Sequence, residues 1–371
     1  MKKKITVLPG DGIGHEVVEQ GIKAMNAINN VFEHHFDFQV HDFGAMSIEK
    51  HGTPLTEKTL KNCLESDAIF LGAIGDPKYD NDPTLLVRPE QGLLKLRKSL
   101  QLFSNIRPIT TYKLLNDASP LKNERLREVD FVIYRELTGG IYFGEKKISE
   151  DKSIASDLCE YSENEISRIA YQAFEAATKR KNKLTLIDKA NVLETSRLWR
   201  RVIQDISKEY PGVEVNYLFV DNAVMQLMLN PSQFDVILTE NMFGDIISDL
   251  ASVITGSLGM LPSSSVGSKT ALFEPIHGSY PQAKGLDIAN PMAAILSAAM
   301  MYEYFDLSQE AEMINNGVNW ALKNGIITQD LNRQDPSACS KVGDVVAWFI
   351  EEKGSVNIKQ ELTKLSLNCI I

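Results

Sequence analysis

Compact β-rich runs that alternate with loops and helical patterns constrain the fold of this 371-residue chain more than any other feature. The runs are ITVLP, DAIFLGAI, DFVIYREL, KLTLIDKA and FDVILTENMFG. Continuous apolar runs of this length are typical of strands whose two faces are both buried. Strands of this kind with helical segments between them predict an α/β protein built on buried sheets.

Helical periodicity supports the same fold class. Apolar residues recur at helical spacing in three segments, which begin at Val17, Ile166 and Ile314. Gly325 follows the third segment, and glycine is a common C-terminal stop of helices. We expect each apolar stripe to face the core. The chain shows no linker, low-complexity tract or internal repeat, so composition marks no domain boundary.

Composition indicates a globular protein without special stabilising groups. The formal net charge of −10 disfavours a general nucleic-acid binder, since such proteins carry excess lysine and arginine. The basic start is followed by too few apolar residues for a signal peptide, and no apolar run has membrane-spanning length. We therefore expect a cytoplasmic protein that binds neither nucleic acid nor membrane. The cysteines form no CxxC pair, which is typical of free thiols in a reducing compartment: Cys63, Cys159, Cys339 and Cys369.

A glycine-rich turn, GDGIG, follows the first β-rich run and precedes the first helical pattern. This order invites interpretation as a dinucleotide-binding loop of the Rossmann type. The spacing is not GxGxxG, however, and Asp11 would place a negative charge where a pyrophosphate should bind. A plain tight turn is the alternative, and the sequence favours it.

Three arginines, Arg97, Arg107 and Arg135, form the strongest functional pattern in the chain. A guanidinium binds a carboxylate through two parallel hydrogen bonds, so three of them predict a small polycarboxylate substrate. If the segment around Arg97 is helical, Leu93 and Leu94 share its face, which suits a branched alkyl group beside a carboxylate. Arg107 and Arg135 are expected where a strand meets a loop. Alternatively, the leucines belong to the core and the arginines are structural.

Acidic residues form a second pattern. Asp245 and Asp249 are spaced four apart, so a helix would place both carboxylates on one face. Carboxylate oxygens are ligands of hard divalent cations, and Asp221 is available as a third donor. The alternative is that Asp245 favours the start of a helix through the dipole and that Asp249 is a surface residue.

A lysine and a tyrosine complete the candidate site. Lys189 directly follows a β-rich run, and a lysine near other cations could lose its proton and act as a base. Tyr142 lies in a glycine-rich turn and could donate a proton. The alternatives are a structural ion pair of Lys189 with Asp188 or Glu194, and a buried aromatic ring at Tyr142.

Five longer motifs occur in one order across most of the chain. They are RELTGGIYFG, DKANVLETSRLWR, NMFGDIISDLAS, GSLGMLPS, and EPIHGS with IANP. Together they resemble the 3-isopropylmalate dehydrogenases of the β-decarboxylating dehydrogenase family, which also contains isocitrate, homoisocitrate and tartrate dehydrogenases. The similarity extends from GDGIG to the segment after IANPMAAILSAAMMYE, so it covers nearly the whole sequence.

The resemblance implies a two-domain α/β fold of the isopropylmalate/isocitrate dehydrogenase type, which differs from the Rossmann fold. The first domain would be discontinuous, formed by residues 1–102 and 256–371, and the second, dimer-forming domain would be formed by residues 103–255. GDGIG would then be a turn at the edge of the cleft between them. The resemblance also implies a homodimer with shared active sites, in which the other subunit contributes Lys189 and Asp221.

The resemblance further implies NAD-dependent oxidative decarboxylation of (2R,3S)-3-isopropylmalate to 4-methyl-2-oxopentanoate and CO₂, a step of leucine biosynthesis. Lys189 would take the hydroxyl proton, and Tyr142 would protonate the enolate at C3. Mg²⁺ or Mn²⁺ would bind to Asp221, Asp245 and Asp249. The substrate contacts that the resemblance implies are Arg97, Arg107, Arg135 and Asp221 for the polar groups, and Glu90, Leu93 and Leu94 for the isopropyl pocket.

By the same resemblance, NAD would lie along residues 76–90 and 277–290, with its adenosine end at the second segment. Gln282 departs from the Asp that members using NAD commonly carry there to accept hydrogen bonds from the ribose. Gln282 and Ala283 are neither basic nor phenolic, and only Lys284 could bind a 2′-phosphate, so NAD stays the expected cofactor. The implied cofactor contacts are Pro77, Glu90, His277, Gly278, Ser279, Gln282, Ala283 and Asn290.

Two other interpretations stay open. Isocitrate dehydrogenases carry polar side chains for a third carboxylate where this chain has Gln91 and Leu93, and a buried leucine facing that carboxylate would be costly. Homoisocitrate and tartrate dehydrogenases are related alternatives. A regulatory subunit that binds cofactor without turnover would lack one of the arginine, lysine, tyrosine or aspartate groups, and none is missing.

Overall fold

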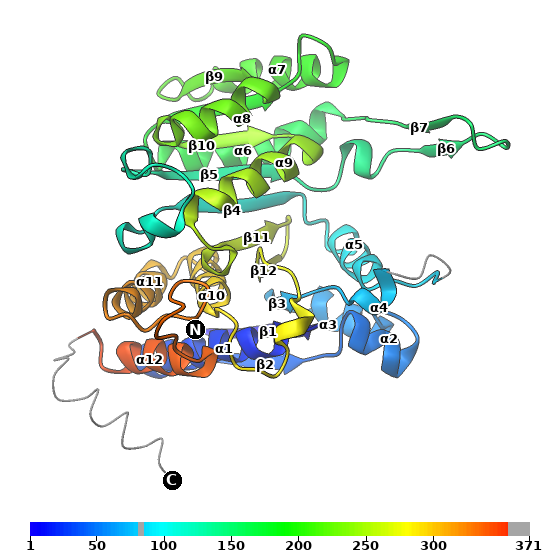
Figure 1. Ribbon diagram of the computed structural model, residues 1–371. Helices are drawn as coiled ribbons and strands as arrows, with labels where there is room; N and C mark the ends of the chain where they lie inside the picture. Colours follow the sequence, from blue (N-terminus) through cyan, green and yellow to red (C-terminus); the bar gives the residue numbers. More distant parts are fainter. Residues whose placement is uncertain (81–84, 355–371) are drawn as a thin grey trace.

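The computed structural model describes residues 1–80 and 85–354, and shows a mixed ten-stranded sheet with helices on both faces (Figure 1). A separate hairpin of β6 (Lys146–Ile148) and β7 (Ala155–Asp157) projects from one side of the molecule. In spatial order the large sheet contains β2 (His35–Val40), β1 (Lys2–Gly10), β3 (Ala68–Ala73), β12 (Ala271–Pro275), β11 (Pro262–Val266), β4 (Ser104–Thr110), β5 (Asp130–Glu136), β10 (Val236–Thr239), β8 (Lys183–Asp188) and β9 (Glu214–Phe219).

Strand direction changes in the middle of this sheet. β11 is antiparallel to both β12 and β4, and β4 is antiparallel to β5, whereas the outer pairs are parallel. The strands from β2 to β11 come from residues 2–73 and 262–275, and those from β4 to β9 come from residues 104–239. One half of the sheet is thus formed by two separate segments of the chain, as the predicted discontinuous first domain would require. The boundaries after residues 102 and 255 stay predictions, and residues 355–371 lie outside the described part.

Helices cover both faces of the half-sheet from β2 to β11. In β3, Phe70 packs into one helical layer and its neighbour Ile69 into the other, so both faces of the strand are buried. The first layer contains α1 (Gly14–Val31), α10 (Met292–Tyr304), α11 (Ser308–Lys323) and α12 (Cys339–Glu351). The opposite layer contains α3 (Glu57–Leu64) and α5 (Pro89–Ser99), with the short helices α2 (Ala45–His51) and α4 (Pro77–Asp80) beside them.

The half-sheet from β4 to β9 is built in the same way. In β5, Val132 packs against one helical layer and Ile133 against the other. The first of these layers contains α6 (Glu163–Thr178) and α7 (Glu194–Ser207), and the second contains α8 (Val220–Leu229) and α9 (Asn241–Ser252). Burial on both faces is the physical reason why adjacent residues in the centres of the runs DAIFLGAI and DFVIYREL are apolar.

The periodic segments form the expected helices. The segments that begin at Val17, Ile166 and Ile314 are α1, α6 and α11, and their apolar stripes face the core. Ser162 caps α6 by accepting a hydrogen bond from the backbone of Glu165. Gly325 follows α11 with φ of +71°, the left-handed conformation that favours glycine at this position. The predicted α/β class is therefore confirmed.

Two further expectations concern the environment of the chain. In the described residues, no helix combines the length and apolar character needed to cross a bilayer. Cys63, Cys159 and Cys339 are free thiols, and burial raises the pKa of Cys63 and of Cys339 to about 12. Cys369 lies outside the described residues. Inert, buried thiols of this kind are structural side chains.

Candidate active site

The centre of the candidate site is an ion pair between β5 and α9. Arg135 is 5% exposed, and its Nη1 donates to Oδ1 of Asp245 at 2.5 Å. Its Nε and Nη2 donate to Asn241 at the start of α9. Tyr142, in the 3₁₀ turn Gly140–Tyr142, donates its hydroxyl proton to Oδ2 of Asp245 at 2.9 Å. Tyr142 is 45% exposed, so the alternative of a buried ring is wrong.

Arg107 approaches the same helix from β4. Its Nη1 donates to Oγ of Ser248 at 2.7 Å and to Oδ1 of Asp249 at 3.3 Å, and its Nε donates to Asn105 at 2.8 Å. The expectation that Arg107 marks the end of a strand is wrong, because it pairs with Ile133 in the middle of β4. Strand alternation nevertheless points it toward α9.

Arg97 completes a cluster of three guanidinium groups, which we call the arginine cluster (Arg97, Arg107 and Arg135). Nη2 of Arg97 donates to Oε1 of Glu274 on β12 at 2.8 Å. Burial is the main cause that lowers the pKa of Arg135 to about 10, and the positive charges of Arg107 and Arg97 lower it further. Burial also lowers the pKa of Arg107. Positive charges that repel each other in a partly dehydrated site favour a polyanionic ligand.

The two leucines near Arg97 have different environments. Leu93 is partly buried and packs against the core beside Leu96. The alternative that this leucine belongs to the core is therefore partly right. Leu94 is 49% exposed on α5, three residues before Arg97, and offers an apolar surface on the arginine side of the helix. Glu90 in the first turn of α5 is exposed. Its carboxylate lies close to the backbone of Gly75, since a Cβ added to that glycine would lie 3.2 Å from Oε1 of Glu90.

Lys189 lies outside the arginine cluster. It directly follows β8, and its Nζ forms an ion pair with Oδ1 of Asp221 at the start of α8. The predicted alternative partners are otherwise occupied: Asp188 pairs with Arg200, and Glu194 pairs with Arg197. No hydrogen bond or ion pair in the described part of the chain joins Lys189 or Asp221 to the arginine cluster or to α9. Lys189 lowers the pKa of Asp221, which keeps this carboxyl ionised.

Carboxylates that could bind a divalent cation are present on α9. Asp245 and Asp249 lie one helical turn apart, and their oxygens have the hard character that Mg²⁺ or Mn²⁺ requires. Within residues 1–80 and 85–354, no three His, Cys, Asp or Glu side chains form a metal-binding group. Asp221 is therefore not brought to this pair within one chain. The donor set fits the cation only if a further ligand comes from elsewhere.

The turn GDGIG leads from β1 to α1. Asp11 is buried, and its carboxylate accepts hydrogen bonds from the backbone of Ala45 at 2.8 Å and of Gly75 at 3.0 Å. An added Cβ on Gly12 would lie 1.9 Å from the carbonyl oxygen of Ser279, so only glycine fits there. Burial raises the pKa of Asp11. The backbone N–H of Gly14 donates to the carbonyl oxygen of Asp11 at 2.9 Å and closes the turn, which supports the tight-turn interpretation.

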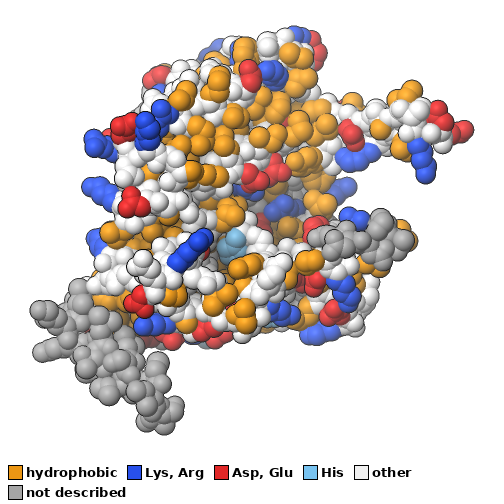
Figure 2. Space-filling model, viewed as in Figure 1, with side chains coloured by type: hydrophobic (Ala, Val, Ile, Leu, Met, Phe, Trp, Pro, Cys, Tyr) orange, Lys and Arg blue, Asp and Glu red, His pale blue; other side chains and the backbone are white. Residues whose placement is uncertain are grey.

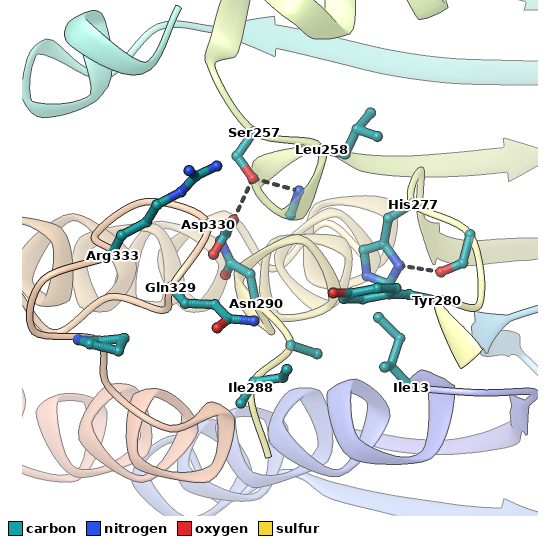
Figure 3. Close-up of a pocket in the computed structure, with 14 residues that line it drawn as sticks. Ile13, Ser257, Leu258, His277, Tyr280, Ile288, Asn290, Gln329, Asp330 and Arg333 are labelled. Carbon is teal, nitrogen blue, oxygen red and sulfur yellow. Dashed lines mark hydrogen bonds between the residues drawn. The ribbon is translucent and has the colours of Figure 1, made fainter. Parts of the chain in front are cut away.

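A pocket of about 650 Å³ lies beside this turn (Figure 3). Ile13, His277 and Tyr280 line one end, and Asn290 lies farther along. Nδ1 of His277 bonds to the carbonyl oxygen of Gly278 at 3.0 Å, and burial lowers the pKa of the imidazole. A neutral ring with apolar neighbours suits the planar base of a nucleotide. We call this cavity the His277 pocket.

A carboxylate ties three segments together at the His277 pocket. Oδ2 of Asp330 accepts hydrogen bonds from Oγ of Ser257 at 2.5 Å and from Nδ2 of Asn290 at 3.0 Å (Figure 3). Its Oδ1 accepts from Thr328 at 2.5 Å. Arg333 lines the same pocket. Arg333 is thus a second basic residue, besides Lys284, that could reach a 2′-phosphate, because the chain returns to the pocket after α11.

The predicted cofactor contacts fall into different environments. His277, Gly278 and Asn290 line the His277 pocket. Ser279 and Ala283 are buried in the same loop, and Gln282 is exposed outside the lining. Pro77 begins α4, and Glu90 lies on α5, so neither touches this pocket. Residues 81–84 of the predicted segment lie outside the described part.

Comparison with known proteins identifies the class. The family model "Isocitrate/isopropylmalate dehydrogenase" matches residues 4–346, and the chain belongs to this family. It is 49% identical over 353 residues to the 3-isopropylmalate dehydrogenase of Bacteroides fragilis (strain YCH46), covering 95% of this chain and 99% of that protein. It is 50% identical over 341 residues to the 3-isopropylmalate dehydrogenase of Bacillus subtilis (strain 168), covering 90% and 93% of the two chains.

Solved structures agree with this identification. The isocitrate dehydrogenase of Methylococcus capsulatus superposes with a TM-score of 0.82 at 31% identity, over 94% of this chain and 99% of that chain. A β-decarboxylating dehydrogenase of Thermococcus kodakarensis in its apo form gives a TM-score of 0.80 at 34% identity, over 95% and 97% of the two chains. The predicted family and fold class are confirmed, and the names of the relatives bear out the predicted dehydrogenase activity.

Proposed function

We propose that the chain catalyses the oxidative decarboxylation of (2R,3S)-3-isopropylmalate to 4-methyl-2-oxopentanoate and CO₂ in leucine biosynthesis. The observation that carries this proposal is the arginine cluster beside Leu94, which combines cationic groups for two carboxylates with an apolar surface for a branched alkyl group. Figure 2 shows charged side chains of both signs in the hollow between the two halves of the sheet. The relatives named 3-isopropylmalate dehydrogenase support the same substrate.

The acid and the base of the reaction have separate positions. Lys189 would take the proton of the C2 hydroxyl as oxidation proceeds. Tyr142 would give its phenolic proton to C3 of the enolate that decarboxylation leaves. Burial, and then the hydrogen bond to Asp245, raise the pKa of Tyr142 above 10, so the phenol carries its proton throughout the neutral range. The arginine cluster would hold the carboxylates in place while the CO₂ leaves.

Two groups from outside the chain complete the chemistry. Bound NAD would supply the hydride acceptor, and bound Mg²⁺ or Mn²⁺ would supply a Lewis acid at the C2 oxygen. The His277 pocket would hold the adenosine end of the cofactor, while Asp245 and Asp249 would hold the cation together with Asp221 of a second subunit. NAD rather than NADP is our proposal, and Arg333 is the residue that could change that preference.

We also propose a homodimer with shared active sites. Met225 and Leu229 on α8 are 55% and 53% exposed, and Ile246 on α9 is 53% exposed. Figure 2 shows hydrophobic side chains gathered over this part of the molecule. The projecting hairpin adds Ile148 and Ile154, which are 64% and 69% exposed. Clustered apolar surface of this kind marks a protein interface, and Lys189 with Asp221 lies next to it.

The dimer can be tested at Leu229. We expect Leu229→Lys to shift the protein from dimer to monomer in light scattering, because a charge would be placed on the apolar face of α8. Activity should fall in parallel, because each site would lose Lys189 and Asp221 of the other subunit. Val40→Lys is the control, since Val40 is 62% exposed on the edge strand β2, far along the sheet. A monomeric Leu229→Lys protein with full activity would contradict shared sites.

The acid role can be tested at Tyr142. We expect Tyr142→Phe to lower kcat by roughly 100-fold or more, because general-acid catalysis contributes about that factor, with a smaller change in KM. The measurement is steady-state NAD reduction. Tyr171→Phe is the matched control, because Tyr171 is also exposed and donates its hydroxyl proton to a carboxylate, Glu209. Full turnover of Tyr142→Phe would remove the tyrosine from the mechanism.

Substrate and cofactor are decided by one assay. Purified protein with Mg²⁺ is offered 3-isopropylmalate, isocitrate and tartrate, each with NAD and with NADP, while absorbance of the reduced cofactor is followed. We expect the highest kcat/KM with 3-isopropylmalate and NAD. Preference for isocitrate would overturn the proposed substrate, and preference for NADP would overturn the proposed cofactor.

The free thiols of Cys63, Cys159 and Cys339 support our further proposal of a cytoplasmic location.

A further inference from the structure

A second large cavity lies on the other face of the sheet from the arginine cluster. It has a volume of about 580 Å³ and is formed by β4, β5 and α6 on one side and by α10 and α11 on the other. Ile106 and Tyr134 line it, whereas their chain neighbours Arg107 and Arg135 point to the opposite face, as strand alternation requires. We call it the back groove.

Two tyrosine hydroxyls in the back groove have no partner. Tyr134 is only 9% exposed, and Tyr112 is half-buried at the edge of the core; both line the cavity. Neither hydroxyl forms a hydrogen bond with any described residue, and burial raises the pKa of each phenol to about 12. Neither oxygen is enclosed, so solvent in the cavity reaches both hydroxyls. Two unpaired hydroxyls that face one cavity are available to bond to a polar ligand there.

A carboxylate in the same cavity also lacks a partner. Glu303 on α10 lines the back groove and forms no ion pair or hydrogen bond within the described residues. Solvent still reaches its side chain, but the surrounding protein raises the pKa of the carboxyl. The nearby guanidinium of Arg180 does not serve it, because it donates to Asp130 and to Asp235, each at 2.7 Å. Glu303 is thus the charge in the groove that a cation would neutralise.

The remaining walls are largely apolar. Ile106, Val132, Leu296 and Met300 line the cavity between the polar groups. A ligand that fits must therefore present an apolar body to these side chains and a hydrogen-bonding cation to Glu303 and the tyrosines. Lys179, the residue that follows α6, lines the cavity without an ion pair in the described residues, and it would accommodate a carboxylate at the other end of a zwitterion.

We propose that the back groove is a binding site for a small organic ammonium ion with an apolar body. The ammonium would donate hydrogen bonds to Glu303 and to the hydroxyls of Tyr134 and Tyr112, and the body would lie against the apolar walls. Aliphatic amines and aliphatic amino acids share this chemistry, and the latter would also use Lys179. The site is distinct from the arginine cluster and from the His277 pocket, and it does not depend on the proposed substrate.

The test is isothermal titration calorimetry of the full-length protein with three probes that share an isobutyl group. They are isopentylamine, which carries only the ammonium, leucine, which carries ammonium and carboxylate, and 4-methylpentanoate, which carries only the carboxylate. We expect isopentylamine, leucine or both to bind with Kd of about 1 mM or tighter. The tighter of the two ammonium probes identifies the source. 4-Methylpentanoate can reach the arginine cluster, so any binding of it should be the same in wild type and in Glu303→Gln. Absence of binding by both ammonium probes would overturn the proposal.

Substitutions in the back groove test whether the ligand binds there. We expect Glu303→Gln to weaken affinity roughly tenfold or more, because it removes a charge-assisted hydrogen bond, and Tyr134→Phe to weaken it several-fold. Glu351→Gln at the exposed end of α12 is the matched control and should bind as the wild type does. Thermal unfolding confirms that each variant is folded. Unchanged affinity in folded Glu303→Gln would place the ligand elsewhere and end the proposal.

Discussion

Replacement of Lys189 by alanine should lower kcat for 3-isopropylmalate oxidation by roughly 10²- to 10⁴-fold. The reason is that Lys189, in its neutral form, is the proposed base for the hydroxyl proton, and its Nζ lies beside Asp221, a proposed ligand of the cation. Metal affinity should fall much less, because the cation would be bound by carboxylates. The measurements are NAD reduction for turnover and Mn²⁺ titration followed by electron paramagnetic resonance.

Folding should be nearly unaffected by this change. The side chain of Asp221 is 64% exposed, so the ion pair with Lys189 contributes little to stability, and the thermal midpoint should move by only about 1–2 °C. Lys208→Ala is the control, because Lys208 pairs with Asp205, whose side chain is as exposed as that of Asp221. Retention of wild-type turnover by Lys189→Ala would assign the base to another residue.

Replacement of Asp245 by asparagine should have the second large effect. Asp245 accepts hydrogen bonds from both Arg135 and Tyr142 and is the predicted cation ligand on α9. Loss of its charge should weaken Mn²⁺ binding by roughly 10- to 100-fold and lower kcat by a similar factor or more, because the cation would supply the Lewis acid. Saturating metal should restore part of the activity.

The same substitution should also affect stability. The guanidinium of Arg135 is buried and would lose its charged partner, at a cost of about 1–3 kcal/mol. Chemical denaturation measures this loss. Asp205→Asn, which removes an exposed carboxylate from α7, is the control and should change neither quantity. If Asp245→Asn bound Mn²⁺ with unchanged affinity, the carboxylate would be structural and the cation site would have to lie elsewhere.

Part of the fold could be predicted because burial on both faces leaves a clear signature. β3, β5, β8 and β10 have mainly apolar central residues and are identifiable as runs. β11 was not, since its sequence PSSSV contains three serines. Ser263, Ser264 and Ser265 are nevertheless buried between β12 and β4, and the hydroxyl of Ser263 donates to the carbonyl of Glu274. Small polar residues that satisfy their own hydroxyls can fill a central strand without any hydrophobic pattern.

The candidate site was predictable to a similar extent. The arginine cluster could be predicted because guanidinium groups have a specific chemistry, whatever strand or helix carries them. Asp330 and Arg333 could not, because they lie in an irregular segment after α11 that has no periodicity and no motif. Only packing of that segment beside Ser257 and Asn290 makes it part of the His277 pocket. Roles that arise from such tertiary contacts leave no local signal.

The pairing of β4 with β5 has a mechanical consequence. Tyr134 and Arg135 are adjacent on one strand and face opposite sides of the sheet, as do Ile106 and Arg107 on its neighbour. A rigid tilt of this two-strand unit that brings the guanidinium groups closer to a substrate must move the tyrosine away from α10. Because the two side chains share one backbone, a movement that narrows the space at the arginine cluster would widen the space between Tyr134 and α10 on the other face of the sheet.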